Sequence, residues 1–530
     1  MKALTVLYGG SLAPEAFEPV FSGKSAFSLA LEKARSFPGT EKIALLGLTG
    51  TEYPGIPAES SDFILVRSDK WTKKSLLEKI SSLGEGFALT FFAWADCPFL
   101  DPVLAKALAD RHLRYAAEYS YADGWPYGFA PELLSPGTAG ILCKILGDDD
   151  GGTVERDTLF SVLQKDINAF DIETEISPVD LRRHRLSLSA DSARNLLLIK
   201  RFFDAGLKGC SEAADLIEKH PGLLRTLPAF YSIQVSGACP QACSLCPWPK
   251  ASQADKGIPV TERRDFMGKA DFGSLLDKIA AFSSDAVIDL SLWGDLSLHP
   301  DKMELIQMAL AKPGLSLVIE TSGLGWKASE LEELARVAAN APSRKTPALP
   351  GAALSWIVSL DASDPERYKE VRGPGYAEAV DCAKKLLDLF PGNAYVQAVR
   401  VKGFEDDIEK FYRYWKEAVP GKGQSHVIIQ KYDDFCGALP KLQASDLSPV
   451  KRLPCWHLMR DMAILIDGKV PVCKEVSAAR GAAEDRSLGN VFDDPLEDIW
   501  KKGEALYLEH GASEYPGMCA ECDEYYTYNF

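Results

Sequence analysis

Short apolar runs alternate with amphipathic segments through the first 155 residues of the chain. Four apolar runs are typical of buried strands, at 3–8, 42–46, 63–66 and 87–92. Apolar residues at helical spacing predict helices between these runs, at 24–36, 72–83 and 102–111. This alternation predicts an α/β layer with a mainly parallel sheet over residues 1–155.

A second alternation of strands and helices begins at residue 229 and continues to residue 430. Six apolar runs predict its strands, at 232–235, 286–292, 315–319, 354–360, 395–401 and 427–430. Helical patterns lie between them, for example at 377–390 and 405–417. Residues 156–228 carry helical patterns without evident chemistry and predict a helical connector. Residues 431–530 predict a further small domain.

Length, charge and cysteine usage narrow the class of protein. A chain of 530 residues is too long for one core and predicts two to four domains. The net charge of −16 argues against a nucleic-acid partner, and no apolar stretch approaches the roughly 20 residues of a membrane span. Five of the twelve cysteines are scattered singly, which fits a cytoplasmic protein, and these are Cys97, Cys143, Cys210, Cys382 and Cys436.

Three of the other cysteines follow the first strand of the second alternation. Cys239, Cys243 and Cys246 have C-x3-C-x2-C spacing and come directly after an apolar run that ends in Ser236 and Gly237. A strand that leads into a loop directs three thiolates at one point, as an iron–sulfur cluster requires. Three ligands on a four-iron cluster leave one iron open. The alternative, a zinc knuckle, needs a fourth cysteine or histidine close by, and none is adjacent.

A second set of four cysteines lies in the last hundred residues. Cys455 and Cys473 enclose Gly468 in the spacing C-x12-G-x4-C, and Cys519 and Cys522 form a C-x2-C pair. The run 463–473 predicts a hairpin leading to the second of these cysteines. Four thiolates fit one [4Fe–4S] cluster without an open iron, which favours electron transfer or a structural role. A zinc site with four thiolate ligands is the alternative.

These motifs together resemble a known family. The C-x3-C-x2-C motif resembles the signature of radical S-adenosylmethionine (SAM) enzymes, and six βα units are the number in their partial (β/α)6 barrel. The four-cysteine region, with Gly489-Asn-Val and Ile499-Trp500, resembles the SPASM/twitch domain of such enzymes. The runs 430–437, 454–458 and 522–530 further resemble the spiro-SPASM proteins reported in spirochaetes.

The resemblance implies a reaction and its cofactors. It implies a [4Fe–4S] cluster at Cys239, Cys243 and Cys246 whose open iron chelates SAM, reductive cleavage to a 5′-deoxyadenosyl radical, and an auxiliary [4Fe–4S] cluster at the four C-terminal cysteines. It also implies a ferredoxin- or flavodoxin-type reductant and a peptide, protein or small-molecule substrate. The implied SAM contacts are Gly294, Asp295, Thr321, Ser322, Ser359, Asp361 and Arg372. A structural ion pair between Asp361 and Arg372 is an alternative.

The first 155 residues resemble sugar-nucleotide cytidylyltransferases in their layout. The resemblance rests on Gly9-Gly10 and on the runs 19–25, 95–102 and 127–129. Basic residues that would neutralise a triphosphate are absent between Gly9 and Phe21, so a retained scaffold for docking is favoured over nucleotidyl transfer. The alternative functions are a nucleotide-handling protein with structural clusters and a non-catalytic iron–sulfur scaffold. The domains expected are 1–155, 156–228, 229–430 and 431–530.

Overall fold

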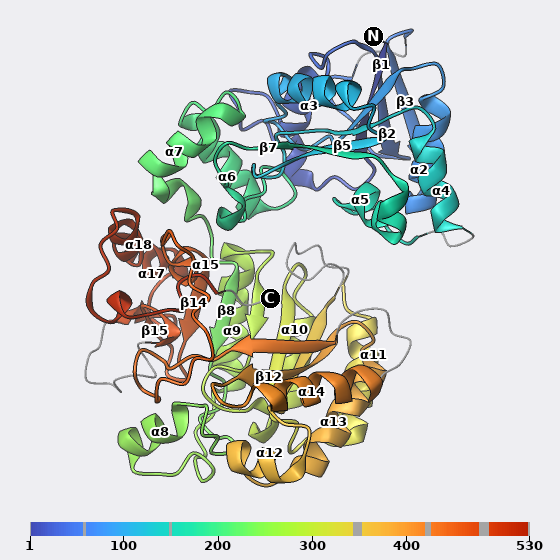
Figure 1. Cartoon of the computed structure of the whole chain (residues 1–530). Coiled ribbons are helices and arrows are strands. Elements are labelled where there is room, and N and C mark those ends of the chain that lie inside the picture. The colour runs from blue at the N-terminus through green and yellow to red at the C-terminus, as the bar shows by residue number, and fades with distance from the viewer. Residues whose placement is uncertain are drawn as a thin grey trace. The chain divides into compact units, whose positions relative to one another are not determined.

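The computed structural model (Figure 1) describes residues 2–56, 60–147, 151–342, 352–418, 426–475 and 487–527. Two compact units make up the chain, Met1–Leu223 and Leu224–Phe530. Among the described residues, no helix is both long enough and apolar enough to cross a membrane.

The first unit is built on a seven-stranded sheet with the order β3-β2-β1-β4-β6-β5-β7. Its strands are β1 Ala3–Gly9, β2 Thr40–Leu48, β3 Phe63–Ser68, β4 Leu89–Trp94, β5 Tyr119–Asp123, β6 Glu132–Leu134 and β7 Ile172–Ile176. Only β6 pairs antiparallel with its neighbours; the other pairs are parallel. The mainly parallel α/β layer predicted from the sequence is therefore confirmed.

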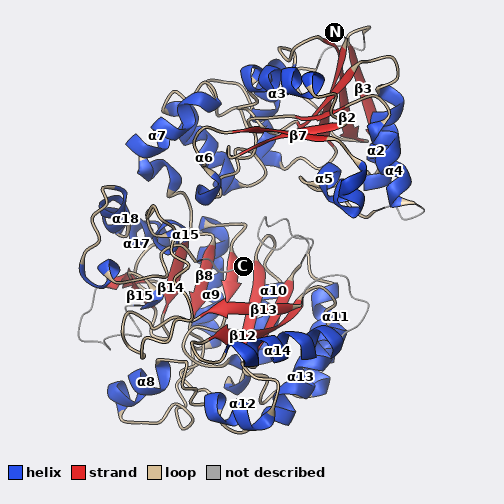
Figure 2. Ribbon diagram, in the orientation of Figure 1, coloured by secondary structure: helices blue, strands red, loops and turns tan. Residues whose placement is uncertain are grey.

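The helices of the first unit are α1 Ala26–Ala34, α2 Lys73–Leu83, α3 Pro102–Arg114, α4 Thr138–Leu146, α5 Thr158–Leu163, α6 Ala193–Asp204 and α7 Ala213–Lys219. Four of them, α1, α2, α3 and α6, begin where a polar side chain caps free N–H groups of the first turn. Ser25, Thr72, Asp101 and Ser192 each accept a backbone hydrogen bond two or three residues ahead. Figure 2 distinguishes these helices from the strands of the sheet.

The expected boundary at residue 155 differs from the structure. β7 lies inside the segment 156–228, which the sequence predicted to be a helical connector, and it pairs parallel with β5 from Tyr119↔Ile172 to Asp123↔Ile176. The sequence pattern missed this strand because Ile172–Ile176 has apolar residues only at its two ends and is at most partly buried. The first unit therefore continues to Leu223.

The second unit contains a parallel seven-stranded sheet with the order β13-β12-β11-β10-β9-β8-β14. Its strands are β8 Phe230–Ile233, β9 Val287–Asp289, β10 Ser316–Thr321, β11 Leu354–Ser359, β12 Ala394–Arg400, β13 Val427–Lys431 and β14 Asp461–Ile464. The first six are the six strands predicted from the sequence, and they form the partial barrel.

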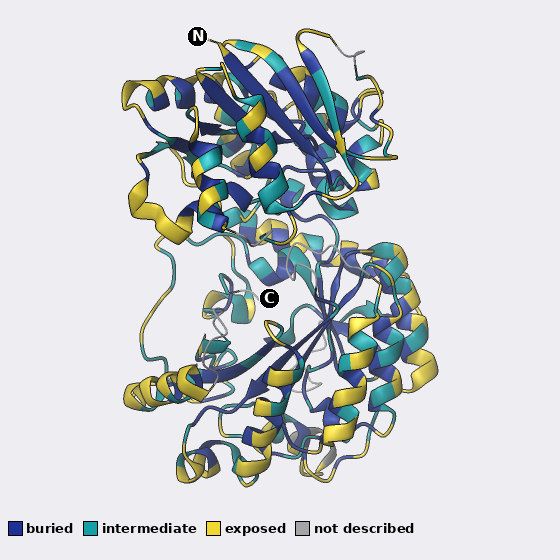
Figure 3. Cartoon of the chain, turned by 90° about the vertical axis from the view of Figure 1, so that its right-hand side faces the viewer, coloured by how far each residue is buried: buried dark blue, intermediate teal, exposed yellow. Residues whose placement is uncertain are grey.

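Helices pack on the outside of this sheet and bury their apolar faces against it (Figure 3). They are α9 Lys269–Phe282, α10 Lys302–Leu310, α11 Ala328–Ala339, α13 Tyr376–Leu389 and α14 Glu405–Ala418. Two further helices, α8 Trp248–Lys256 and α12 Pro365–Arg372, follow the cysteine loop and β11. The C-terminal region adds α15 Trp456–Arg460, β15 Lys469–Pro471, β16 Ser487–Asn490, α17 Leu496–Lys502 and α18 Glu504–Gly511.

The C-terminal region is joined to the barrel through β14. This strand extends the barrel sheet beyond β8, in parallel register from Phe230↔Asp461 to Ile233↔Ile464. The predicted hairpin at 463–473 is therefore wrong in its pairing: the turn exists, with Gly468 N–H bonded to the Leu465 carbonyl at 2.9 Å, but β15 pairs antiparallel with β16. Burial of Met462 and Ile464 in the barrel core favours the pairing with β8.

The segment that enters β8 is fastened to the C-terminal helices by Arg225. Its guanidinium donates to the Leu458 carbonyl at 2.9 Å and the Trp500 carbonyl at 2.7 Å, and it lies 3.6 Å from the centre of the Trp500 ring. The Trp500 indole N–H donates in return to the Thr226 carbonyl at 2.7 Å. Because Arg225 is only 4% exposed, these contacts satisfy a charge that burial would otherwise penalise.

His112 gives the first unit a testable pH dependence. Its Nδ1 and Nε2 lie 2.7 and 2.9 Å from the hydroxyls of Ser120 and Ser135, and burial lowers its pKa from 6.5 to about 4. The unfolded chain therefore takes up this proton at a higher pH than the folded chain. The contribution of His112 to the free energy of unfolding is full above pH 6.5 and falls as the pH drops towards 4. We expect the first unit to lose about 2 kcal/mol between pH 7 and pH 5 from this group.

The control is His112→Gln, which should be less stable than the parent at pH 7 but lack this part of the pH dependence. Denaturant unfolding of both proteins at the two pH values measures the difference. Parallel losses in both proteins would show that His112 does not contribute.

Candidate active site

The three cysteines of the C-x3-C-x2-C motif line one cavity at the C-terminal end of the barrel strands. This cavity has a volume of about 730 Å³, within the usual range for small-molecule sites. Cys246 N–H bonds to the Cys243 carbonyl at 3.3 Å, and Cys239 N–H bonds to the Val260 carbonyl at 3.2 Å, so the loop holds its own shape. Burial, followed by the neighbouring Cys243, raises the pKa of Cys246 to about 12. Metal binding at these thiols would therefore release protons.

The segment after β9 packs directly on the cysteine loop. Gly294 has φ +151°, and a Cβ there would lie 2.0 Å from the Ser236 carbonyl oxygen. Trp293 adopts a left-handed φ of 47°, and Asp295 N–H bonds to the Ala238 carbonyl at 2.9 Å. Both Gly294 and Asp295 line the cavity. Glycine is required at this position because no larger residue allows the two loops to approach so closely.

Asp295, Thr321 and Ser322 come together as the sequence suggested, but they bond to one another. The Asp295 carboxylate accepts from the Thr321 hydroxyl at 3.0 Å and from the Ser322 hydroxyl and N–H at 2.6 and 2.8 Å. It also accepts from Ser297 N–H at 2.9 Å and is 2% exposed. The carboxylate thus fastens the ends of β9 and β10 in the cavity wall, and its oxygens already have donors.

Asp361 and Arg372 form the ion pair that the sequence left open. Arg372 Nε lies 2.7 Å from one Asp361 carboxylate oxygen, and the other oxygen accepts from Val399 N–H at 2.8 Å. Arg372 Nη1 also lies 3.9 Å from the Cys243 sulfur. Burial raises the pKa of Cys243, and the guanidinium opposes this by favouring the thiolate. The pair therefore places a positive charge beside one of the three candidate ligands.

The sequence analysis missed the polar residues inside the barrel cavity. Glu320 of β10 accepts from the hydroxyl of Ser359 at 2.5 Å and from the side-chain amide of Gln397 at 2.8 Å. Asp289 of β9 also lines the cavity, and burial raises its pKa to about 6. Each acid directly follows apolar residues of its strand. An acidic residue at the end of such a run was the sequence signal that could have identified them. Of this group only Ser359 was predicted.

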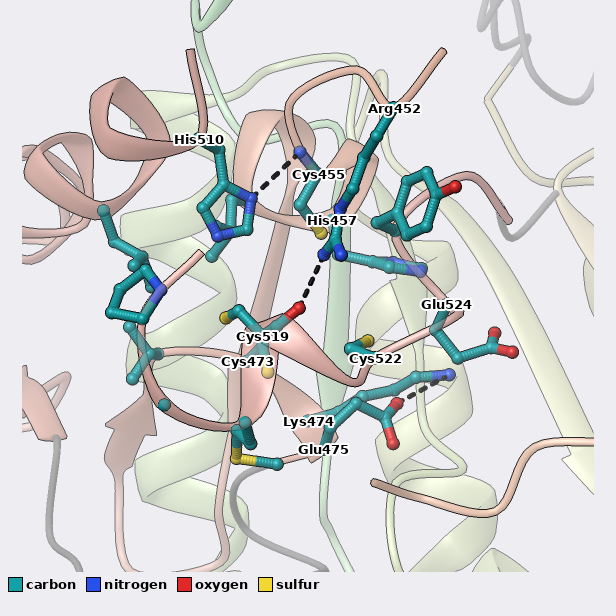
Figure 4. Close-up of a pocket in the computed structure, with 17 residues that line it drawn as sticks. Arg452, Cys455, His457, Cys473, Lys474, Glu475, His510, Cys519, Cys522 and Glu524 are labelled. Atoms are coloured by element: carbon teal, nitrogen blue, oxygen red, sulfur yellow. Dashed lines mark hydrogen bonds and ion pairs between the residues drawn. The ribbon is translucent and has the colours of Figure 1, made fainter. Parts of the chain in front are cut away.

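The four C-terminal cysteines line a second cavity (Figure 4). Cys455 precedes α15, Cys473 follows β15, and Cys519 and Cys522 lie at the turn after α18. The Cys455 N–H donates to His510 Nδ1 at 3.4 Å, and burial raises the pKa of the Cys455 thiol. Arg452 donates to the Cys519 carbonyl at 2.6 Å. All four predicted thiols thus line one cavity, and four thiolates are the donor chemistry of an iron–sulfur cluster or of a zinc site.

Lys474 and Glu524 line both cavities and form a wall between them. Lys431 reaches the same wall, where it pairs with Glu524 and lies 3.0 Å from Asp523. Cys436, which the sequence left among the scattered cysteines, also reaches this region, where the neighbouring Cys522 and then burial raise the pKa of its thiol. No local pattern identifies Cys436, because Cys522 is remote in sequence.

In the first unit, Asp96, which lies in the run 95–102 of the cytidylyltransferase-like layout, is held by an arginine. Arg156 donates to the two Asp96 carboxylate oxygens at 2.8 and 2.5 Å and to Asp191 at 3.1 Å. Its guanidinium lies 4.1 Å from the centre of the Trp94 ring, and Asp96 is 1% exposed. Arg156 therefore occupies the carboxylates of Asp96 and Asp191.

Comparison with known proteins identifies the C-terminal domain. Residues 455–523 match the family model of the SPASM iron–sulfur cluster-binding domain. The crystal structure of Streptococcus suis SuiB bound to precursor peptide SuiA is similar with a TM-score of 0.42 at 14% identity, over 70% of this chain and 82% of that one. The crystal structure of BtrN in complex with AdoMet and 2-DOIA has a TM-score of 0.34 at 13% identity, over 57% and 93%.

The chain thus combines a match to the SPASM domain model with a three-cysteine motif and a parallel barrel. An uncharacterized protein of Treponema pallidum (strain Nichols) is 40% identical over 379 residues, which are 70% of this chain and 98% of that protein. The chain belongs to the same family as this Treponema protein.

Replacing Gly294 with alanine tests the close approach of the two loops. Gly294→Ala should destabilise the second unit by about 4 kcal/mol or more, because the new Cβ has no space beside the Ser236 carbonyl. Gly403→Ala is the matched control, since Gly403 also has a positive φ, +85°, but nothing within 4 Å of a Cβ. The control should lose only about 1–2 kcal/mol. Urea unfolding of the metal-free proteins measures both, and equal losses would contradict the packing argument.

Proposed function

We propose that this chain reductively cleaves SAM at a [4Fe–4S] cluster held by Cys239, Cys243 and Cys246. The resulting 5′-deoxyadenosyl radical would abstract hydrogen from a bound substrate. The observation that carries the proposal is that the three thiols line one ligand-sized cavity at the end of a parallel barrel. Three thiolates leave the fourth iron of such a cluster free for the cofactor. The cofactor supplies the radical chemistry, while the protein binds, orients and shields the reactants.

The chain's own residues would then have distinct roles around the cofactor. Gly294 allows the backbone after β9 to reach the loop that carries the three cysteines, and Thr321 and Ser322 hold Asp295 in the wall of the cavity. Arg372, fixed by Asp361, places its charge beside Cys243 and would favour the thiolate form of that ligand. Ser359 and Glu320 offer polar groups deeper in the barrel.

The substrate would bind in the same cavity, which extends from the three cysteines to Lys474 and Glu524. Because these two residues also line the four-cysteine cavity, a bound molecule would lie close to both sites. We propose that Cys455, Cys473, Cys519 and Cys522 hold an auxiliary [4Fe–4S] cluster that accepts the electron released on substrate oxidation. The cavity suits a peptide side chain or a small molecule in size.

The same proposal assigns an electron donor and a role for the first unit. A ferredoxin- or flavodoxin-type protein would supply the reducing electron. We place this reaction in the cytoplasm, where cysteine thiols are kept reduced. The first unit would serve for docking, because Arg156 occupies the carboxylates of Asp96 and Asp191. A nucleotide-handling function has less support for the same reason.

Cleavage of SAM is testable without knowledge of the substrate. Protein reconstituted anaerobically with iron and sulfide should form 5′-deoxyadenosine from SAM when dithionite is added, as measured by chromatography and mass spectrometry. Cys246→Ala should form about 100-fold less or lower still, because the cluster loses one of three ligands. Cys382→Ala is the control. Cys382 is buried in α13, and it is not one of the described residues that line either cavity. A fully loaded parent protein that never forms 5′-deoxyadenosine would overturn the proposal and favour a non-catalytic scaffold.

A further inference from the structure

His510 brings an imidazole ring into the wall of the four-cysteine cavity. It lies in the last turn of α18, and Leu506, one turn earlier on the same face of this helix, lines the cavity as well. His510 is 2% exposed, and the ring of Tyr515 packs edge-on against it with the ring centres 5.1 Å apart. The ring is therefore held in one place beside the four thiols.

The two ring nitrogens of His510 differ in their contacts. Nδ1 accepts the N–H of Cys455 at 3.4 Å, so this nitrogen carries no proton and the proton of the ring is on Nε2. Nε2 is buried and has no hydrogen-bond partner within the part of the chain that the structure describes. In the view of Figure 4 it is turned away from Cys455, on the side where Cys519 lies. His510 thus offers a buried N–H donor at the cavity.

A buried donor without a partner is costly to keep. It gives up its hydrogen bonds to water without replacement, at a cost of about 1–3 kcal/mol, and such a group calls for a specific explanation. His457, the other histidine that lines this cavity, shows the contrast. Its Nδ1 lies 2.6 Å from the Asp461 carboxylate and its Nε2 lies 3.3 Å from the Thr527 hydroxyl. Of the two histidines, only His510 has a nitrogen left for a group bound among the cysteines.

We propose that His510 donates its Nε2–H to a sulfur of the auxiliary cluster and thereby raises the reduction potential of that cluster. This inference rests on the proposed function, since it requires a [4Fe–4S] cluster at the four cysteines. The four thiolates supply one ligand for each iron, and a nitrogen that carries a proton cannot bind a metal. His510 therefore acts on the cluster without being one of its ligands.

The direction of the effect follows from charge. Reduction adds an electron to a cluster that already carries the charge of its thiolates, and an N–H directed at a sulfur stabilises this added charge. Hydrogen bonds to the sulfurs are among the factors that set the potentials of such clusters. A higher potential would make the auxiliary cluster a better acceptor for the electron released on substrate oxidation.

The test uses the full chain with Cys239, Cys243 and Cys246 all replaced by alanine, so that iron and redox signals come only from the auxiliary site. In this background His510→Phe removes the donor but keeps a ring, and His510→Gln keeps a side-chain N–H. His220→Phe is the control, because His220 is an exposed histidine of the first unit. Each protein is reconstituted, its iron, sulfide and zinc are measured, and its midpoint potential is determined by electron paramagnetic resonance during redox titration.

We expect His510→Phe to hold the same amount of iron and to shift the midpoint to a more negative value. His510→Gln should lie closer to the background protein, and His220→Phe should match it. An unchanged midpoint in His510→Phe would overturn the inference. Loss of iron from a folded His510→Phe protein would also overturn it, because the ring would then be a ligand.

A second measurement needs no substitution at His510 to be decisive. The background protein is produced with ¹⁵N-labelled histidine, and its reduced cluster is studied by pulsed electron paramagnetic resonance. A hydrogen bond predicts a weak coupling to one ¹⁵N nucleus and to a proton that exchanges in D₂O, and the ¹⁵N coupling should be lost in His510→Gln. Absence of any ¹⁵N coupling in the background protein, or a strong coupling typical of a directly bound nitrogen, would contradict the assignment.

The metal analysis separates this inference from the proposed function on which it rests. Zinc in place of iron in the background protein would overturn the auxiliary cluster itself, and the inference with it. Iron and sulfide in cluster proportions, combined with unchanged potentials, would overturn the role of His510 alone. Formation of 5′-deoxyadenosine by the parent chain is measured independently and is affected by neither result.

Discussion

The parallel pairing of β14 with β8 is the constraint on which the rest of the second unit depends. β8 leads into the loop with Cys239, and Cys455 lies just ahead of β14, so one backbone ladder carries both cysteine sites. Without this pairing, the C-terminal domain would be attached to the barrel only by side-chain contacts and by the chain after β13. With it, the distance between the two sites is set by main-chain hydrogen bonds, and the wall containing Lys474 and Glu524 is held between them.

The barrel shows how far apolar patterns determine a fold. All six of its strands follow from apolar runs, because a strand covered by helices needs apolar residues on both faces. The apolar pattern failed in the segment that leads to the three-cysteine cavity. The run 286–292 predicts one long strand, but β9 ends at Asp289. Beyond it the chain turns through the positive φ values of Trp293 and Gly294 to meet the cysteine loop. A sequence pattern contains no signal for that turn except the glycine.

The residues of the candidate sites also divide into those that local sequence predicts and those that only the fold brings together. Close spacing on one loop predicted the set of Cys239, Cys243 and Cys246, whereas the four C-terminal cysteines were grouped through the family resemblance. The Asp361–Arg372 pair lies within one βα connection. Contacts between distant segments were missed or misjudged. Asp295 was expected to face a ligand, yet Thr321 and Ser322 at the end of the next strand occupy its oxygens. The bonds of Glu320 to Ser359 and Gln397 likewise join three different strands. Such pairs follow from tertiary structure, which local spacing does not encode.

The contacts of Arg225 have a consequence for where the chain can be divided. All strands of the second sheet, and the arginine that fastens its entry segment to Leu458 and Trp500, lie within Leu224–Phe530. The two compact units are continuous stretches of sequence, so the chain passes from one to the other only once. A cut or a fusion placed between Leu223 and Leu224 would therefore divide no strand pair of either seven-stranded sheet.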